Sequence, residues 1–289
     1  MAGWDAHRFR SADGRLDLFA RIYPGDGPAL VLMHGLTRNS ADFEPLAERL
    51  AGRYRLVVPD QRGRGLSDHD PDPLQYRPDV YAADMFALLD GLGIDRAGLI
   101  GTSMGGLMAM VMAALRPALV AGIVLNDVGT VLDPAGIARI QGYVGASEPA
   151  ADWAEAARRT AAINAVAFPD FAERDWLAFA MRLWHALPDG RLALSYDPAI
   201  GESIRGDAPV TVPPDLWPLW EMIGSVPVLL LRGELSDLLA PETVAEMTRR
   251  HVGPLDSVEV TRVGHAPVLD EPEAVAAIEA FLRNHFPVA

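Results

Sequence analysis

The sequence predicts an α/β fold in which a mostly parallel, doubly wound sheet of about eight strands carries an inserted helical cap. Short apolar runs typical of buried strands alternate with segments that have helical spacing of their apolar residues. Between residues 129 and 225 this alternation stops, and strand signals return at 226. The 289 residues, 50% of them hydrophobic, suffice for one large domain with an insertion. We therefore expect a core formed by 1–128 and 226–289, with a cap formed by 129–225.

The individual elements follow from local patterns. Asp13-Gly14 is a turn signal between two half-alternating runs, which predicts an N-terminal hairpin over 7–10 and 16–22. Apolar runs predict strands at 29–33, 56–58, 97–100, 121–125, 226–231 and 257–263. Helical spacing of apolar residues predicts core helices at 40–50, 79–92, 104–115, 241–251 and 271–285, and cap helices at 151–168 and 171–187.

Composition excludes several function classes. The net charge of −14 leaves no basic patch for phosphates, so we expect no nucleic-acid partner. The sequence has no cysteine, which rules out disulfides, thiolate metal sites and cysteine nucleophiles. The apolar tract 104–115 is too short to span a bilayer, and the N-terminus has no apolar signal segment. We expect a cytoplasmic protein without a membrane partner, and nothing in the sequence indicates a metal or a cofactor.

A nucleophile is predicted at the turn after the strand at 97–100. There the chain reads Gly101-Thr102-Ser103-Met104-Gly105, a Gly-x-Ser-x-Gly pattern between an apolar strand and an apolar helix. In this context the turn is so tight that only glycine fits on either side of the serine. The strained backbone at the centre pushes the Ser103 hydroxyl out above the sheet, where it is free to attack a substrate.

A serine hydroxyl needs a base, and the base needs an acid that orients it. Among the seven histidines His265 fits best, because it lies in a glycine- and proline-containing loop just after the last strand. The acid is predicted to be Asp237, which follows the preceding strand by a short loop at the same edge of the sheet. Asp127, at the end of the strand at 121–125, and Glu234 are the two alternatives. The order Ser, Asp, His is the chain order of this architecture.

Two backbone N–H groups are predicted to stabilise a negatively charged oxygen that forms when the serine attacks a carbonyl. Met104 follows the nucleophile at a helix N-terminus, where the helix dipole adds to its N–H. Leu36 follows His34-Gly35 at the end of an earlier strand, and the glycine lets the backbone turn toward the site. We interpret His34 as an orienting residue at the substrate pocket rather than a second base.

These motifs resemble those of the α/β-hydrolase fold superfamily. The resemblance rests on motifs that occur in the expected order, namely His34-Gly35, the loop from Asp60 to Ser67, Gly101 to Gly106, Arg232 to Asp237, and Gly264-His265. It covers nearly the whole chain outside the insertion and implies a serine hydrolase with a helical cap over the site. The loop from Asp60 to Ser67 serves mainly as scaffold in this superfamily, so Arg62 and Arg64 are not counted as catalytic.

Five of the six tryptophans lie in the predicted cap. Of these, Trp153, Trp184 and Trp220 are candidates to line an apolar pocket above Ser103, although packing of cap helices explains each of them equally well. Four polar residues of the same segment are interpreted as surface residues, namely Arg182, His185, Arg191 and Tyr196.

The resemblance implies a cofactor-independent hydrolase of small, largely apolar carboxylic esters, similar to a carboxylesterase. One alternative is a lactonase or a hydrolase of carbon–carbon bonds in ring-cleavage products. Such carbon–carbon hydrolases often place Trp after the base, whereas Ala266 follows His265 here, and their anionic substrates demand an arginine that the cap does not obviously supply. A non-catalytic ligand receptor and a cofactor-free perhydrolase are further alternatives, and fold alone does not separate these functions.

Overall fold

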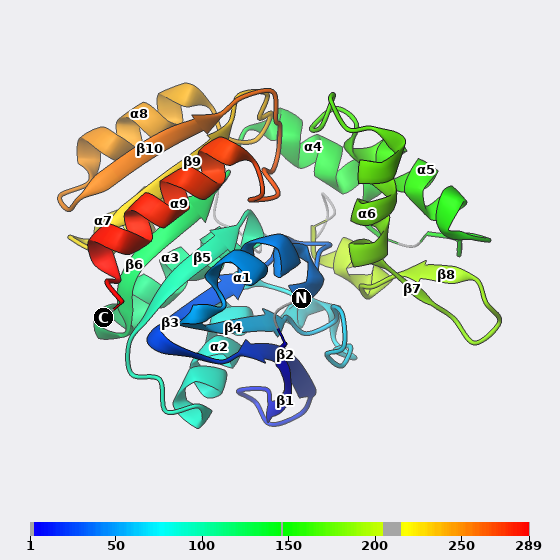
Figure 1. The fold of residues 1–289 in the computed structure, drawn as a ribbon, viewed down its shortest axis with the longest axis horizontal. Coiled ribbons are helices and arrows are strands. Elements are labelled where there is room, and N and C mark those ends of the chain that lie inside the picture. The colour runs from blue at the N-terminus through cyan, green and yellow to red at the C-terminus, as the bar shows by residue number, and fades with distance from the viewer. Residues whose placement is uncertain (1–2, 146, 205–214, 289) are drawn as a thin grey trace.

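The computed structural model describes residues 3–145, 147–204 and 215–288. These residues contain an eight-stranded sheet with the strand order β1, β2, β4, β3, β5, β6, β9, β10 (Figure 1). The strands are β1 Asp5–Arg10, β2 Asp17–Tyr23, β3 Gly25–Met33, β4 Gly52–Asp60, β5 Ala97–Thr102, β6 Val120–Asn126, β9 Val228–Gly233 and β10 Leu255–Val260. β2 pairs antiparallel with β1 and β4, and the remaining neighbours are parallel. The predicted, mostly parallel sheet is confirmed.

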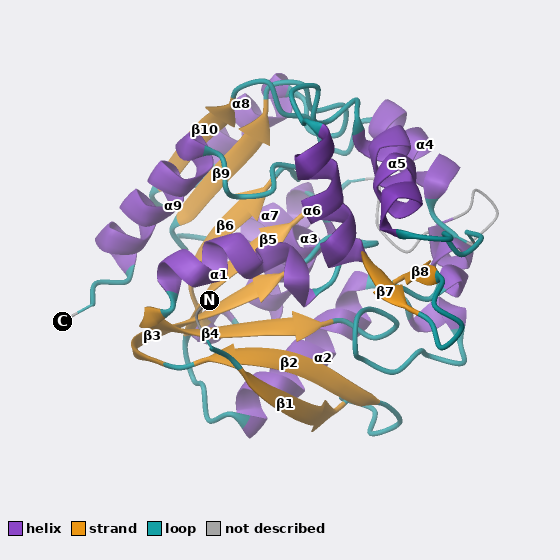
Figure 2. Cartoon of the chain, turned by 45° about the vertical axis from the view of Figure 1, so that its right-hand side comes forward, coloured by secondary structure: helices purple, strands orange, loops and turns teal. Residues whose placement is uncertain are grey.

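Alternation of side chains along the central strands gives the sheet two apolar faces. In β9, Val228 and Leu230 belong to one core cluster, and Leu229 and Leu231 belong to the other. The first cluster is covered mainly by α2 Pro78–Gly91, α3 Met104–Leu115, α7 Trp217–Ile223 and α8 Pro241–Arg250. The second is covered mainly by α1 Glu44–Leu50 and α9 Pro272–His285. The helices therefore lie on both sides of the sheet, as Figure 2 shows.

The chain between β6 and β7 leaves the sheet and forms the helices α4 Pro134–Tyr143, α5 Trp153–Asn164 and α6 Glu173–Leu183. A short hairpin follows, made of β7 Trp184–Ala186 and β8 Leu192–Leu194. Figure 1 shows these elements gathered beyond the ends of the sheet strands, at the right of the view. The helices predicted at 151–168 and 171–187 correspond to α5 and α6, whereas α4 and the hairpin were not predicted.

α7 differs from the expectation for the inserted segment. Its residues Trp220 and Ile223 are buried in the same cluster as the core helices α2 and α3. The helix therefore packs on the same face of the sheet as α2 and α3, although it lies within the range predicted to form the cap. No helix in the described ranges is long and apolar enough to cross a membrane.

Candidate active site

Ser103 occupies the sharp turn between β5 and α3. Its backbone has φ 51° and ψ −114°, in the positive-φ region that a residue with a side chain rarely adopts. A Cβ at Gly101 would lie 2.3 Å from the carbonyl oxygen of Gly105, and a Cβ at Gly105 would lie 2.0 Å from that of Met33. Only glycine therefore allows the strand and the helix to approach so closely, as the sequence pattern predicted.

The Ser103 hydroxyl is hydrogen-bonded to His265. Its Oγ lies 2.9 Å from His265 Nε2, and His265 Nδ1 lies 2.8 Å from Oδ2 of Asp127. Since a carboxylate accepts the Nδ1 proton, Nε2 is left to accept the proton of the serine hydroxyl. His265 comes from the loop between β10 and α9, so three distant parts of the chain meet at the carboxyl edge of the sheet.

Asp127 is held in place by the loop after β9. The residue follows β6 directly and has a positive φ of 55°. Its Oδ1 accepts the N–H of Gly233 at 2.8 Å, and its Oδ2 accepts the hydroxyl of Ser236 at 2.6 Å in addition to His265. The side chain is fully buried. These bonds fix the carboxylate in one orientation, facing the imidazole.

The prediction that Asp237 orients the imidazole is therefore wrong. The carboxylate of Asp237 turns away from His265 and accepts two N–H groups of Arg139 on α4, at 2.5 and 2.9 Å. This hydrogen-bonded arginine holds the pKa of Asp237 below its usual range. Glu234, the other alternative, accepts the backbone N–H of Arg262 on the surface. The carboxylate that contacts the imidazole belongs to Asp127, which the sequence offered as an alternative.

The two N–H groups predicted to bind an oxyanion lie beside the serine turn. Met104 is the first residue of α3, so its N–H has no carbonyl partner within the helix. Leu36 lines the same cavity as Ser103. Buried Arg64 contacts both residues: its Nε donates to the carbonyl of Leu36 at 2.9 Å, and its Nη2 lies 3.5 Å from Sδ of Met104. Arg64 is thus a scaffold residue that links both sides of the predicted oxyanion site.

His34 does not line the substrate pocket. The imidazole is fully buried, with Nδ1 2.8 Å from the carbonyl of Gly35 and Nε2 accepting the N–H of Gln61 at 3.1 Å. Burial lowers its pKa to about 3, so the ring is neutral and donates from Nδ1. The neutral ring joins the loop after β3 to the loop after β4, the geometry expected of an orienting residue, and His34 is not among the residues that line the cavity at Ser103.

Of the three predicted pocket tryptophans, only Trp184 lines a cavity described near the site. Its indole N–H donates to Thr160 Oγ1 at 3.0 Å. Trp153 packs against the core cluster that contains α5 and α6 residues, and Trp220 is buried below the sheet, where its ring lies 5.1 Å from that of His251. Neither residue lines either of these two cavities, so their place in the substrate pocket stays a prediction.

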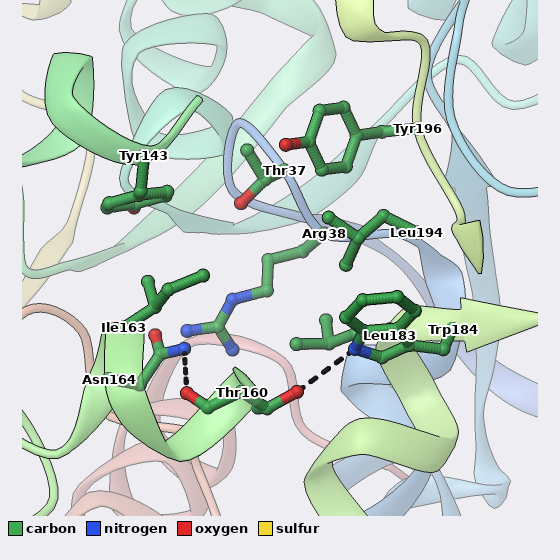
Figure 3. A pocket seen from close by; sticks show the side chains of 10 residues that line it. All are labelled: Thr37, Arg38, Tyr143, Thr160, Ile163, Asn164, Leu183, Trp184, Leu194 and Tyr196. Atoms are coloured by element: carbon green, nitrogen blue, oxygen red, sulfur yellow. Dashed lines mark hydrogen bonds between the residues drawn. The ribbon is translucent and has the colours of Figure 1, made fainter. Parts of the chain in front are cut away.

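A cavity that is open to solvent is lined by Ser103 and His265. Residues of the inserted segment that line it are Ile140, Tyr143 and Asn164, and Arg38 lines it from the loop after β3. Burial raises the pKa of Tyr143, so its hydroxyl stays protonated at neutral pH. A second cavity of about 410 Å³ adjoins the first (Figure 3). Tyr196, interpreted from the sequence as a surface residue, is 6% exposed and lines this second cavity.

Among the described residues, no group of three or more His, Asp or Glu side chains is arranged to hold a metal ion. The chemistry of the site is that of a serine whose hydroxyl proton has an acceptor, next to two backbone donors. This arrangement suits attack on a carbonyl carbon.

The family model for the alpha/beta hydrolase fold matches residues 28–272. The chain belongs to the alpha/beta hydrolase fold family. Hydrolysis is accordingly the reaction class of this protein, and the resemblance predicted from the sequence motifs is confirmed.

Three similar proteins extend over nearly the whole hydrolase chain. A 3-hydroxybutyrate-oligomer hydrolase of Cupriavidus necator is 36% identical over 90% of both chains. A 2-(acetamidomethylene)succinate hydrolase of Mesorhizobium japonicum is 30% identical over 82% of this chain and 81% of that protein. The crystal structure of an alpha/beta hydrolase from Novosphingobium aromaticivorans superimposes with a TM-score of 0.91 at 44% identity, covering 98% of this chain and 99% of that one.

Proposed function

We propose that the protein is a serine hydrolase that cleaves carboxylic esters through an acyl-enzyme. The observation that carries the proposal is the chain of two hydrogen bonds, 2.9 Å from Ser103 to His265 and 2.8 Å from His265 to Asp127. In the first step Ser103 Oγ bonds to the ester carbonyl carbon while its proton moves to His265 Nε2. The tetrahedral intermediate then collapses, the alcohol leaves with that proton, and the acyl group stays on Ser103.

In the second step water takes the place of the serine hydroxyl. His265 accepts a proton from the water, the resulting hydroxyl group bonds to the acyl carbon, and the acid leaves as Ser103 regains its proton. Asp127 stabilises the imidazolium that forms in both steps and keeps Nε2 directed at Ser103. The backbone N–H groups of Leu36 and Met104 bind the negatively charged oxygen of each tetrahedral intermediate.

Ester bonds are the preferred target for two reasons. The hydroxyl of Ser103 has a proton acceptor in His265, which suits attack on an ester carbonyl carbon. The Cupriavidus necator relative is named for a 3-hydroxybutyrate oligomer, and units of a hydroxy acid are joined through ester bonds. A lactone is a cyclic ester, so the same steps also open it.

We further propose that α4, α5, α6 and the β7–β8 hairpin form a cap. Ile140, Tyr143 and Asn164 come from this segment, and they line the cavity opposite Ser103 and His265. This assignment takes the cap as residues 134–194 rather than the predicted 129–225, because α7 packs with the core helices.

Hydrolysis of a carbon–carbon bond in a ring-cleavage product is a second candidate. The sequence argument against it was the lack of an obvious cap arginine for an anionic substrate. Arg38 supplies such a cation from the core side, where it lines the cavity. The Mesorhizobium japonicum relative is also named for an anionic substrate, a substituted succinate.

A panel of 4-nitrophenyl esters of increasing acyl length, assayed alongside a dienoate ring-fission product, tests the proposal. We expect hydrolysis of the short esters by the wild-type protein and loss of turnover in Ser103→Ala. Turnover of the dienoate alone would favour the second candidate. Hydrolysis of no ester, or undiminished turnover by Ser103→Ala, would refute the ester hydrolase.

A further inference from the structure

The two cavities at the site share one wall. Thr37, Arg38, Tyr143 and Asn164 line both of them, so the cavity over Ser103 continues into the second one past these residues. Figure 3 shows the Arg38 side chain running into the middle of the residues that line the second cavity. Among the described residues that line the two cavities, Arg38 alone carries a permanent charge.

Arg38 is held from two sides. Its Nη1 donates to both carboxylate oxygens of Asp42 at 3.0 and 3.2 Å, and its guanidinium carbon lies 4.5 Å from the centre of the Phe179 ring. The Arg38 side chain is 12% exposed and that of Asp42 is 6% exposed. Two contacts on a largely buried side chain fix the plane of the guanidinium before any ligand binds.

The contacts leave part of the guanidinium available. Of the hydrogen bonds formed by described residues, those that involve the Arg38 side chain use Nη1 only. Nε and Nη2 form a pair of parallel N–H donors, the geometry that binds the two oxygens of a carboxylate. Because Asp42 already balances the single charge of Arg38, the free donors suit a singly charged carboxylate better than a dianionic phosphate.

The aliphatic part of the Arg38 side chain lies near Ser103. A Cβ built on Gly35 would lie 3.6 Å from Cγ of Arg38 and 3.8 Å from Cβ of Ser103. Both distances are ordinary van der Waals contacts, so the aliphatic part of Arg38 and the Cβ of Ser103 border the same space beside Gly35. Arg38 and Ser103 line the same cavity, so one small molecule can place a carboxylate at the guanidinium and a carbonyl carbon at the serine.

Tyr143 adds a donor on the opposite wall. Tyr143 lines both cavities, and burial raises the pKa of its hydroxyl, so the group is protonated and can donate to a ligand. Arg139 itself is paired with Asp237, so its charge is balanced outside the cavity. The wall shared by the two cavities thus offers two kinds of donor, the free N–H groups of Arg38 and the hydroxyl of Tyr143.

We propose that Arg38 is a specificity-determining residue that binds a free carboxylate of the substrate. This inference rests on the proposed function and deepens it: the substrate is a carboxylic ester that carries a second, ionised carboxylate a few atoms from the ester carbonyl. Half-esters of short dicarboxylic acids have this chemistry.

The test compares two esters that differ only in charge, 4-nitrophenyl hydrogen glutarate and 4-nitrophenyl methyl glutarate. We expect the wild-type protein to prefer the anionic ester by about tenfold or more in kcat/KM. Arg38→Met should reduce this ratio to about one, mainly through KM of the anionic ester, and Arg38→Lys should restore it in part. Arg174→Met is the matched control, because Arg174 is 88% exposed on α6 and its loss changes the net charge equally. It should keep the wild-type ratio.

Binding of glutarate to Ser103→Ala, measured by calorimetry, separates this inference from the proposed function. Glutarate should bind Ser103→Ala and should lose about tenfold or more in affinity when Arg38→Met is added. Hydrolysis of both esters with no preference for the anion, or a ratio that Arg38→Met leaves unchanged, would overturn the role of Arg38 alone. Hydrolysis of neither ester would overturn the ester hydrolase, while glutarate binding would still decide whether Arg38 recognises a carboxylate.

Discussion

Asp127 and His265 are joined by a hydrogen bond of 2.8 Å between Oδ2 and Nδ1, although 138 positions separate them in the chain. Asp237, which lies nearer to the histidine in sequence, is bound to Arg139 instead. The strand ends that reach the site, rather than proximity along the chain, determine which carboxylate meets the imidazole.

This pairing predicts how two asparagine substitutions differ. Asp127→Asn should lower kcat/KM for esters by about 10⁴-fold, because an amide does not hold the imidazole in the required tautomer. Asp237→Asn should lower it by less than about tenfold, because Asp237 does not contact His265. Steady-state kinetics on both variants measure the difference. A larger loss in Asp237→Asn would instead identify Asp237, in the loop after β9, as the residue that orients His265.

The ion pair between Arg139 and Asp237 should stabilise the position of α4. Both side chains are partly exposed, at 21% and 31%, so we expect a coupling energy of about 1 kcal/mol in a double-mutant cycle of Arg139→Met and Asp237→Asn at pH 7. The pKa of Asp237 is lowered in the folded state, so this stabilisation exists above the unfolded pKa and is lost as the pH falls below about 4. A coupling energy that is equal at pH 7 and pH 3 would show that charge is not its source.

Gly101 should tolerate no side chain. In Gly101→Ala the new Cβ would meet the carbonyl oxygen of Gly105 at 2.3 Å, so the turn must open and we expect a loss of about 3 kcal/mol or more in the free energy of unfolding. Gly91→Ala is the control, since a Cβ at this helical position meets nothing within 4 Å and should stabilise by about 0.5 kcal/mol. Urea denaturation measures both changes. Equal effects would mean that the turn is not closely packed.

His34 should make stability depend on pH. Its pKa is about 3 when folded, so between pH 3 and about 6.5 the unfolded state binds a proton that the folded state does not. Stability from this residue is therefore fully present above about pH 6.5 and falls by roughly 1 kcal/mol per unit as the pH drops through that range. His34→Gln removes this dependence, so the stability gap between wild type and variant should narrow from pH 8 to pH 4. A gap that stays constant would contradict a neutral, buried His34.

Parts of the site could be predicted from the sequence because their signals are local. The glycines around Ser103 and the Gly-His pair at 264–265 indicate tight turns directly after strands, where a reactive side chain is exposed at the edge of the sheet. The structure brings Ser103 and His265 together. The choice between Asp127 and Asp237 was not local. Both follow strands at the same edge of the sheet, and only the contacts of Asp127 with Gly233 and Ser236 decide it.

The cavity wall was the least predictable part. The sequence does not mark Arg38 as a cavity residue, because its loop follows β3 in the core, outside the inserted segment. Trp220 was assigned to the cap because it lies within the inserted range, yet it packs below the sheet. The side of a helix that meets the substrate depends on tertiary packing, which apolar spacing alone does not specify.

The most direct measurement is the mass of the protein during turnover of a 4-nitrophenyl ester quenched in acid. We expect a transient increase by the mass of one acyl group, located on the peptide that contains Ser103. This adduct should be absent in Ser103→Ala and should form far more slowly in His265→Ala. Turnover without an acyl adduct, or an adduct on another residue, would contradict the acyl-enzyme mechanism.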